Sequence, residues 1–330
     1  MRDLLSLRET DVADIRRILE TAEAFKEILE RPVKKVPTLR GRSVVMLFYE
    51  ASTRTRTSFE LAAKYMSAEA VNIAVAQSSV IKGESLKDTL RTLQALTADW
   101  VVIRHASSGA AHLAAQFTDV PVINAGDGRH EHPTQGLLDI LTIWENKIVG
   151  REDETYPRAL SPDRPFDLSP LTVAIVGDLA HSRVARSNVW GLTKLGAKVR
   201  WVGPQTLLPQ DADRLPITVH TDLREALEGA DVVMALRLQT ERQEKGLLPS
   251  LREYSRLWGI TPKALKYAKP NVLVMHPGPL NRGVEISAEV ADGVGGIRAA
   301  IEQQVTNGIA VRMACLYLLM RPSGVPMEEG

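Results

Sequence analysis

A run of hydroxyl and guanidinium side chains occupies residues 52–58, Ser-Thr-Arg-Thr-Arg-Thr-Ser. It follows an apolar run at 44–49 that predicts a buried strand, and it precedes a helical pattern at 59–66. The first N–H groups of a helix have no partner within the helix and lie at the positive end of its dipole. These features favour binding of a dianion such as phosphate. A solvated polar helix start is the alternative, because Ser and Thr are good caps.

Polar residues also follow three further predicted strands, at 71–76, 100–104 and 121–124. Helical patterns lie between these strands, and such alternation predicts a parallel sheet with crossover helices. The carboxyl ends of parallel strands meet at one edge of the sheet, where ligands bind. We therefore expect one site that contains Arg54, Lys82, Arg104 and His132.

The pattern repeats after residue 170 and predicts an α/β protein of two similar-sized lobes, each a parallel sheet flanked by helices, with the active site in the cleft between them. Four prolines and a charge cluster at 150–170 predict an exposed connection. We place one domain at 1–147 and the other at 148–306. A C-terminal helix at 307–330 is expected to pack back on the first domain, after a helix at 297–305 that ends at Asn307-Gly308.

Arginines follow two predicted strands of the second lobe, and an arginine can hold a carboxylate bidentately. Arg183 follows the strand at 171–176, and Arg237 with Gln239 follows the strand at 231–235. Solvated loop arginines are the alternative. Residues 276–279, His-Pro-Gly-Pro, follow the last strand and either line the same cleft or form a rigid turn. The single Gly177 is not a G-x-G-x-x-G motif, so a dinucleotide site has little support.

A metal site is the competing interpretation of one segment. His130 and His132 flank Glu131 in an H-x-H pattern, and Asp127 lies close by in sequence. A catalytic zinc needs three protein ligands and an open position, and the other histidines form no second tight cluster in sequence. A metal-dependent hydrolase therefore stays open as a minor alternative. Neither a serine elbow nor a G-x-x-x-x-G-K-[ST] loop is present, so covalent serine chemistry and nucleoside triphosphates lack support.

The composition indicates which classes of binding partner and which cellular compartment are to be expected. With 41 basic and 40 acidic residues the formal net charge is +1, and aromatic residues make up 5%, which argues against nucleic-acid binding. The one cysteine, Cys315, allows no intramolecular disulfide and favours an intracellular protein. The charged N-terminus is unlike a signal peptide, and no apolar run approaches the roughly 20 residues of a membrane span. We expect a cytoplasmic protein that acts without a membrane.

Two separated motifs resemble the aspartate/ornithine carbamoyltransferase family: residues 48–60, Phe-Tyr-Glu-Ala-Ser-Thr-Arg-Thr-Arg-Thr-Ser-Phe-Glu, and residues 132–135, His-Pro-Thr-Gln. The resemblance extends through residues 82–84, 104–105, 176–179 and 304–308 and covers nearly the whole chain. Residues 237–239 and 276–279 resemble the aspartate branch. The ornithine branch usually shows a His-Cys-Leu-Pro motif, and the only cysteine here lies elsewhere. Residues 276–282 depart from the family's His-Pro-Leu-Pro-Arg variant.

The resemblance implies a binding site for carbamoyl phosphate. The residues that it assigns to this substrate are Ser52, Thr53, Arg54, Thr55, Ser78, Lys82, Arg104, His132, Gln135, Gly278 and Pro279. The catalytic residues among them would be Arg54, Thr55, Lys82, Arg104 and His132. Ser52 to Thr55 would hold the phosphate, Arg104, His132 and Thr55 would polarise the carbonyl, and Gln135 would hold the carbamoyl amine.

The resemblance also implies the second substrate and the assembly. Lys82, Arg183, Arg237 and Gln239 would bind L-aspartate, and Ser78 and Lys82 would reach into the site of a neighbouring subunit of a homotrimer. No cofactor or metal is implied. The implied activity is the committed step of de novo pyrimidine synthesis, and the trimer could assemble with a regulatory chain or another enzyme of that pathway. Transfer to ornithine or another amino acid, and a catalytically inactive scaffold, remain alternatives.

Overall fold

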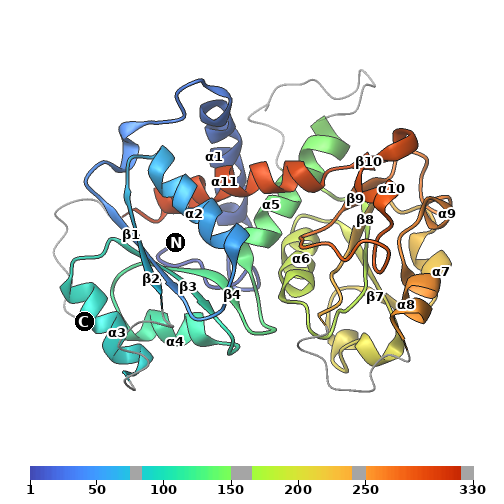
Figure 1. The fold of residues 1–330 in the computed structure, drawn as a ribbon, viewed down its shortest axis with the longest axis horizontal. Coiled ribbons are helices and arrows are strands. Elements are labelled where there is room, and N and C mark those ends of the chain that lie inside the picture. The colour runs from blue at the N-terminus through green and yellow to red at the C-terminus, as the bar shows by residue number, and fades with distance from the viewer. Residues whose placement is uncertain (75–83, 150–165, 240–249, 321–330) are drawn as a thin grey trace. The chain divides into compact units, whose positions relative to one another are not determined.

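The protein, seen in a computed structural model that describes residues 1–74, 84–149, 166–239 and 250–320, divides into two compact units (Figure 1). Unit 1 comprises Met1–Thr134 and Gly308–Gly330, and unit 2 comprises Gln135–Asn307. The first boundary lies inside helix α5 (Pro133–Trp144), whereas the sequence-based boundary follows residue 147.

Unit 1 alternates strands and helices around a parallel four-stranded sheet with the order β2-β1-β3-β4. A long helix, α1 (Val12–Glu30), and a short 3-10 turn, η1 (Pro37–Leu39), precede the sheet. The remaining elements are β1 (Ser43–Phe48), α2 (Thr53–Tyr65), β2 (Glu69–Ala74), α3 (Leu86–Ala95), β3 (Trp100–His105), α4 (Ala110–Phe117) and β4 (Val122–Asp127). The predicted parallel sheet with crossover helices is confirmed.

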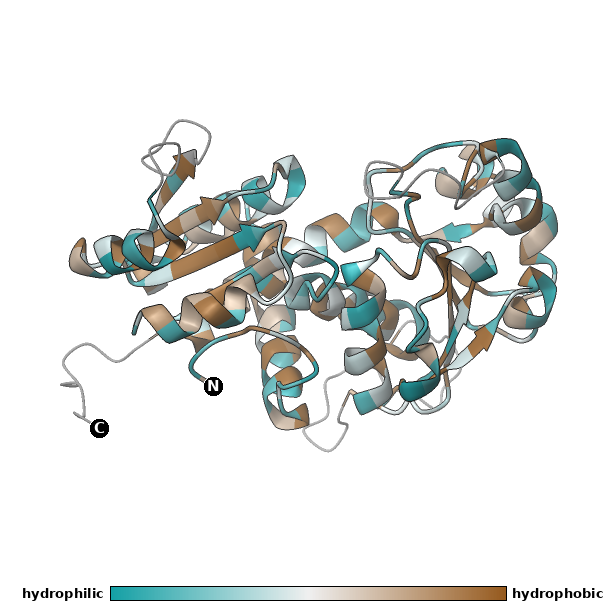
Figure 2. Cartoon of the chain, turned by 90° about the horizontal axis from the view of Figure 1, so that it is seen from below, coloured by the Kyte–Doolittle hydropathy of each residue, from teal (hydrophilic) through white to brown (hydrophobic). Residues whose placement is uncertain are grey.

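Helices cover both faces of the sheet in unit 1. Figure 1 shows α3 and α4 on one face and α1 and α2 on the other. Val45 and Leu47 of β1 pack with Leu90 of α3 and Ala114 of α4 in one apolar cluster. Figure 2 shows the strands mainly in the colour of hydrophobic residues. A sheet buried on both faces needs nearly continuous apolar strands, and this is the pattern that residues 44–49 carry.

The N-terminal segment lies along β4, at an edge of this sheet. The Leu4 amide donates to the Val122 carbonyl at 2.9 Å, and the Asn124 amide donates to the Leu4 carbonyl at 2.9 Å. The Asp3 carboxylate accepts from the Val122 amide at 2.8 Å. Leu4 is completely buried. The segment before α1 is therefore fixed by backbone pairing rather than by a helix of its own.

Unit 2 contains a six-stranded parallel sheet with the order β10-β9-β8-β5-β6-β7. It starts with α5, which continues as a π turn at Glu145–Val149. Its strands are β5 (Thr172–Val176), β6 (Lys198–Val202), β7 (Thr218–His220), β8 (Val232–Ala235), β9 (Leu273–Met275) and β10 (Arg298–Ala299). Its helices are α6 (Arg183–Lys194), α7 (Leu223–Leu227), α8 (Leu251–Trp258), α9 (Pro262–Leu265), α10 (Ala288–Ala291) and the first part of α11 (Ile301–Leu318). Short 3-10 turns lie at Gln205–Leu207, Ala212–Arg214 and Val294–Gly296.

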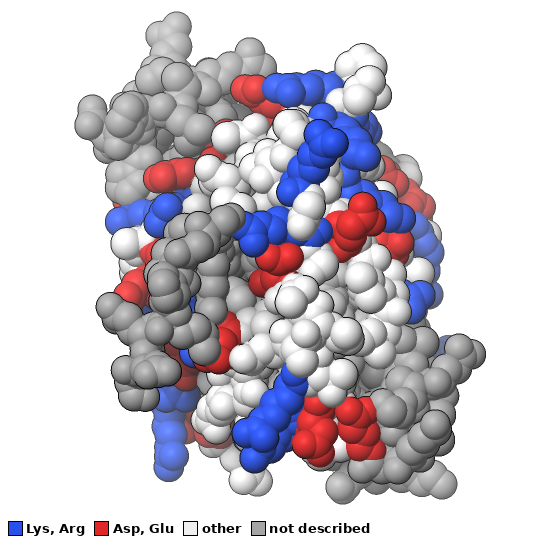
Figure 3. Space-filling view, turned by 90° about the vertical axis from the view of Figure 1, so that its left-hand side faces the viewer, with Lys and Arg blue, Asp and Glu red and all other residues white. Residues whose placement is uncertain are grey.

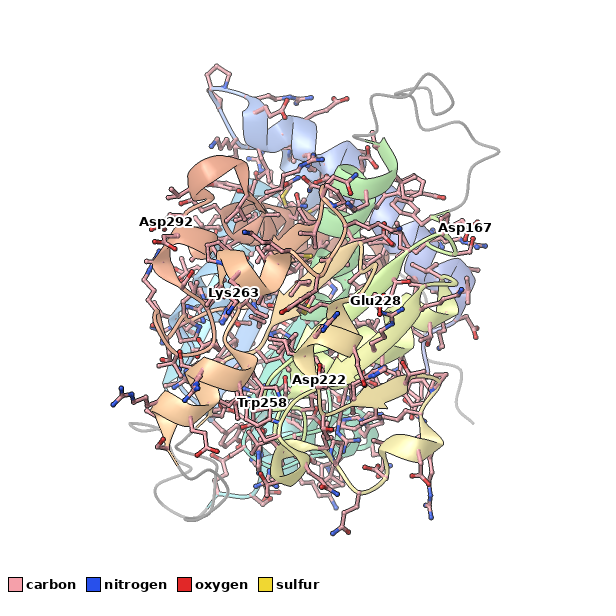
Figure 4. All side chains as sticks on the ribbon, turned by 90° about the vertical axis from the view of Figure 1, so that its right-hand side faces the viewer. Asp167, Asp222, Glu228, Trp258, Lys263 and Asp292 are labelled. Atoms are coloured by element: carbon pink, nitrogen blue, oxygen red, sulfur yellow. The ribbon has the colours of Figure 1, made fainter. Side chains whose placement is uncertain are left out.

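Side-chain caps start most of the short helices of unit 2. Asp222 caps α7 by accepting from the Glu225 amide at 3.1 Å, and the Trp258 indole at the end of α8 donates to the Thr221 carbonyl at 3.1 Å. Figure 4 labels Asp222 and Trp258, which lie close together in unit 2. Side-chain caps such as that of Asp222 supply partners that helices of one or two turns cannot provide for themselves.

The C-terminal helix corrects the sequence prediction. One helix, α11, runs through Asn307 and Gly308, so the predicted break is wrong. The predicted helix at 297–305 is confirmed from Ile301 on, but residues 298–299 form β10 instead of its first turn. The buried Asn307 amide donates to the Thr142 hydroxyl at 2.9 Å and to Glu145 at 2.8 Å. These bonds to α5 and the turn after it stabilise the helix at a position where the local sequence indicates a stop.

Basic and acidic residues lie side by side on one face of the molecule (Figure 3). On the face that Figure 3 shows, Lys and Arg lie beside Asp and Glu, with uncharged residues between them. This mixture agrees with the net charge of +1. Among the helices of the described ranges, none combines the length and the apolar character that crossing a membrane requires.

Cys315 gives a direct test of the packing of α11. The side chain is completely buried, and burial raises the pKa of this thiol to about 12. Since the thiolate is the reactive form, a thiol reagent at pH 8 should leave the native protein unmodified. The same reagent should modify one thiol per chain in urea, which serves as the control. Rapid modification of the native protein would show that α11 does not pack as described.

Candidate active site

The residues after β1 form an open helix start. Ser52 is the N-cap residue of α2, but its side chain accepts no hydrogen bond from the helix. By contrast, Ser85, Ser182 and Ser250 each accept an N–H at the start of their own helices. The N–H groups in the first turn of α2 are thus not satisfied by the cap side chain and suit an external anion.

The hydroxyl and guanidinium run does not act as a unit. Thr53 and Arg54 are exposed, and Thr55 is buried beside them. Ser58, one turn further, faces the core and accepts from the Arg312 guanidinium of α11 at 2.7 Å. Arg312 also stacks over the Phe59 ring at 5.1 Å from its centroid. Ser58 is therefore engaged within the protein and is not available to a ligand.

Arg104 lies beside this helix start. It pairs with Phe48 in the register of β1 and β3, and its carbonyl accepts from the Tyr49 amide at 2.8 Å. Its guanidinium donates to Glu50 at 3.3 Å and to the Ala125 carbonyl at 3.1 Å. The side chain is only 11% exposed. Bonds on both sides fix the guanidinium at the carboxyl edge of the sheet, and its positive charge suits a developing oxyanion there.

His132 follows β4 at the same edge. Its side chain is buried, and its Nδ1 lies 3.4 Å from the Thr134 hydroxyl at the start of α5. The neighbouring Glu131 carboxylate accepts from the Leu7 amide at 2.8 Å and from the Arg8 amide at 3.2 Å. Glu131 thus ties the turn that carries His132 to the N-terminal segment.

The H-x-H pattern separates into two environments. His132 lies with the substrate candidates, whereas His130 bonds the buried Asp127 carboxylate at 3.1 Å. Burial raises the pKa of Asp127, but hydrogen bonds from His130 and Asn124 outweigh it, so this pKa is lowered overall. The hydrogen bond to Asp127 in turn raises the pKa of His130. For His105, at the end of β3, burial lowers the pKa.

In unit 2, a buried carboxylate accepts a hydrogen bond from Gln135 and orients its side chain. Asp139 of α5 is completely buried and accepts from three amides: Gln135 at 3.0 Å, Asn188 at 2.7 Å and Gln304 at 2.8 Å. The Gln135 nitrogen is thereby engaged, and its Oε1 is left as an acceptor for an N–H group of a ligand. Neither Asp139 nor Asn188 was singled out from the sequence, because only the tertiary fold brings them together.

The arginine segments of unit 2 meet at one sheet edge. β5 and β8 are neighbouring parallel strands, with Val176 opposite Ala235, so the segments that follow them lie side by side. The Gln239 amide donates to the His181 carbonyl at 3.3 Å and joins the two segments. Arg183 is buried at the start of α6, and Arg237 is half-buried. Guanidiniums held in this way suit carboxylates.

The segment after β9 forms a hydrogen-bonded turn. His276 is buried; its Nδ1 accepts from the Gly278 amide at 2.8 Å, and its amide donates to Gln304 at 2.9 Å. Gly278 has φ of 64°, a left-handed conformation that favours glycine, and it precedes Pro279 through a cis peptide bond. Arg282 forms an exposed bidentate pair with Asp292, which Figure 4 labels.

Two candidate residues, Ser78 and Lys82, lie outside the described residues, as does most of the connection at 150–170. The remaining candidates divide between the units. Unit 1 carries Ser52 to Thr55, Arg104 and His132 at the edge of one sheet, and unit 2 carries Gln135, Arg183, Arg237, Gln239, Gly278 and Pro279.

Comparisons with known proteins cover nearly the whole chain. Residues 2–145 match the family "Aspartate/ornithine carbamoyltransferase, carbamoyl-P binding domain", and residues 169–319 match its "Asp/Orn binding domain". The chain is 58% identical to the aspartate carbamoyltransferase catalytic subunit of Heliobacterium modesticaldum, over 98% of this chain and 97% of the relative. It is 56% identical to that of Moorella thermoacetica, over 97% of each.

Solved structures of the same family are similar to this chain over nearly its whole length. Aspartate transcarbamoylase from Trypanosoma cruzi in complex with carbamoyl phosphate and aspartate superposes with a TM-score of 0.81 at 31% identity, covering 97% of each chain. Ornithine carbamoyltransferase from Pyrococcus furiosus superposes with a TM-score of 0.80 at 28% identity, covering 98% of each chain.

Proposed function

Because the chain belongs to the aspartate/ornithine carbamoyltransferase family, we propose that it transfers the carbamoyl group of carbamoyl phosphate to the amine of L-aspartate. The products are N-carbamoyl-L-aspartate and phosphate. Relatives at 56–58% identity over nearly the full chain carry the aspartate name. In the structure, the proposal rests mainly on the open first turn of α2 with Arg104 beside it.

The first turn of α2 binds the phosphate group in this proposal. Its backbone N–H groups, the hydroxyls of Ser52, Thr53 and Thr55, and the Arg54 guanidinium supply donors to the phosphate oxygens. Together with the dipole of a helix of 13 residues, they favour a dianion at this place. Phosphate is also the leaving group, so the same donors stabilise it as its bond to carbon breaks.

Arg104, His132 and Thr55 stabilise the charge that develops on the carbonyl oxygen. The aspartate amine attacks the carbonyl carbon, and the carbonyl electrons move to oxygen in a tetrahedral intermediate. Positioned donors of this kind contribute roughly 3–4 kcal/mol each to the transition state. Gln135 Oε1 accepts from the carbamoyl NH₂, because its own nitrogen donates to Asp139. The departing phosphate takes the amine proton, so these steps use only the substrates and this chain's side chains.

Arg183, Arg237 and Gln239 bind the two carboxylates of L-aspartate in the proposal. Their segments adjoin at the carboxyl ends of β5 and β8. For transfer, the amine must lie within bonding reach of the carbamoyl carbon, so positioning contributes as much as the donors do. We further propose a cytoplasmic enzyme of pyrimidine synthesis, in line with the named activity of its relatives.

The choice of amine acceptor tests the function. With carbamoyl phosphate as donor, phosphate release should be fast with L-aspartate and at background level with L-ornithine, because a guanidinium pair suits a second carboxylate and repels a second amine. Identical concentrations of both acceptors make the comparison direct. Release that is as fast with ornithine would overturn the aspartate assignment, and release with neither would overturn the carbamoyltransferase assignment.

A homotrimer with shared sites is a further part of the proposal. Ser78 and Lys82, whose segment the described ranges leave out, would act in the site of a neighbouring subunit. Lys82→Ala and His132→Ala should each be inactive alone. After the two variants are mixed under conditions that exchange subunits, activity should return, because some sites then contain both native residues. Mixed, well-folded oligomers that recover none would show that each site is self-contained.

A further inference from the structure

Three chain segments of unit 1 bring together a group of side chains that can ligate a metal and that are not assigned to substrate. His112 lies on α4, Asp127 ends β4, and His130 lies in the turn before α5. One ligand atom from each of the three lies within 4.8 Å of the others. The two imidazole rings meet edge to face, with their centroids 5.3 Å apart.

The surroundings of this group fit a bound cation. The Asp127 carboxylate is 1% exposed and bonds His130 Nδ1 at 3.1 Å, whereas the two histidine side chains are about 30% exposed. A cation can therefore enter from solvent and keep a water ligand. Glu9, from the N-terminal segment, adds a second carboxylate, which lies 2.9 Å from His112 Nε2.

We propose that His112, Asp127 and His130 bind a divalent transition-metal ion of the zinc class. Two imidazole nitrogens and one carboxylate oxygen form a ligand set that zinc uses when it keeps one position open. Hard cations such as Mg²⁺ prefer oxygen ligands throughout, so the nitrogens select against them. Tetrahedral zinc holds its ligand atoms about 3.3 Å apart, a contraction that small side-chain rotations provide.

The rest of the Asp127 network holds the carboxylate in place for this role. Its oxygens accept from the Gly109 amide at 2.7 Å and from the Asn124 amide at 2.8 Å. Partners of this kind orient a ligating carboxylate and are part of a working metal site. The ion would take the position now bridged by the hydrogen bond between His130 and Asp127. It would link α4 to the turn that leads to His132.

The site is independent of the proposed carbamoyl transfer. The H-x-H pattern of the sequence suggested a site of His130 with His132, but the structure groups His130 with His112 instead. The ion would therefore act as a structural link in unit 1 and not as a Lewis acid for the reaction. Its predicted signature is a gain in stability upon binding, whatever the acceptor specificity of the enzyme.

Calorimetric titration of ZnCl₂ into the full-length, untagged and EDTA-treated protein tests the proposal. One saturable equivalent per chain and a raised unfolding midpoint are expected. His112→Gln and His130→Asn should each weaken this binding at least about tenfold. The matched control is His220→Asn in unit 2, where His220 Nε2 lies 3.2 Å from the Thr218 hydroxyl; it should bind zinc like the native chain. MgCl₂ should give no saturable heat.

Other outcomes would overturn the site. The proposal is wrong if zinc shows no saturable binding, or if binding survives both substitutions. It is also wrong if His220→Asn weakens zinc binding as much as they do. Loss only in His132→Asn would place the ion among the substrate residues instead. His112 is partly exposed on α4, so His112→Gln should fold even if His130→Asn does not. Comparing the unfolding midpoint of His112→Gln without zinc with that of the native chain tests whether this variant folds.

Discussion

Arg54→Ala is expected to lower turnover of carbamoyl phosphate and L-aspartate at least about 100-fold, the cost of removing one charged donor from a transition state. Arg54 is exposed in the open first turn of α2, so its replacement leaves no cavity. The far-UV spectrum and the unfolding midpoint should remain those of the native chain. Initial rates of phosphate release measure the effect.

Arg56→Ala provides the matched control on the same helix. Arg56 is also exposed, but two positions along a helix it points to a different side, and its charge acts on Glu60. Its loss should change the rate by less than about twofold, because a surface ion pair contributes little. Comparable losses in both variants would mean that general positive charge, and not a phosphate contact of Arg54, is responsible.

Asp139→Asn is expected to destabilise unit 2 by about 3 kcal/mol or more, measured by urea unfolding. The substitution keeps the shape but replaces a carboxylate that accepts from three amides with a group that has only one acceptor oxygen. Each hydrogen bond to a buried charged group contributes about 1.5–3 kcal/mol, and the new NH₂ group meets a donor. Gln135 loses its orientation, so the KM for carbamoyl phosphate should rise as well.

Asp222→Asn is the control that separates loss of the three hydrogen bonds to Asp139 from a general effect of replacing Asp by Asn. Asp222 is exposed and caps α7 with a single bond, and Asn caps a helix about as well as Asp does. Asp222→Asn should therefore change the free energy of unfolding by less than about 0.5 kcal/mol. A loss below about 1 kcal/mol in Asp139→Asn would show that the three amides find other partners.

The sheets could be predicted from local sequence because buried parallel strands are short, continuous apolar runs between turn signals. Residues 44–49 and 171–176 show this pattern, and β1 and β5 form there. The placement of Arg104 beside the start of α2 also followed, since parallel strands bring their carboxyl ends to one edge. The strands β1 and β5, and the position of Arg104 near the start of α2, could therefore be predicted without tertiary information.

Features that depend on contacts between residues far apart in sequence could not be predicted from the sequence. Asn307 and Gly308 indicate a helix end locally, but bonds from Asn307 to Thr142 and Glu145, far away in sequence, carry α11 through them. Likewise, nothing in the spacing of His112 connects it to Asp127, because the intervening strand decides where α4 lies. In both cases, packing overrides the local signal.

The N-terminal segment has a consequence for solubility. β4 is an edge strand of its sheet, and an open edge is a template on which another chain can add a strand. Leu4 and the Asp3 carboxylate already occupy backbone groups of Val122 and Asn124 along that edge. The segment thus blocks strand addition from other molecules at β4, in addition to its link to His132 through Glu131.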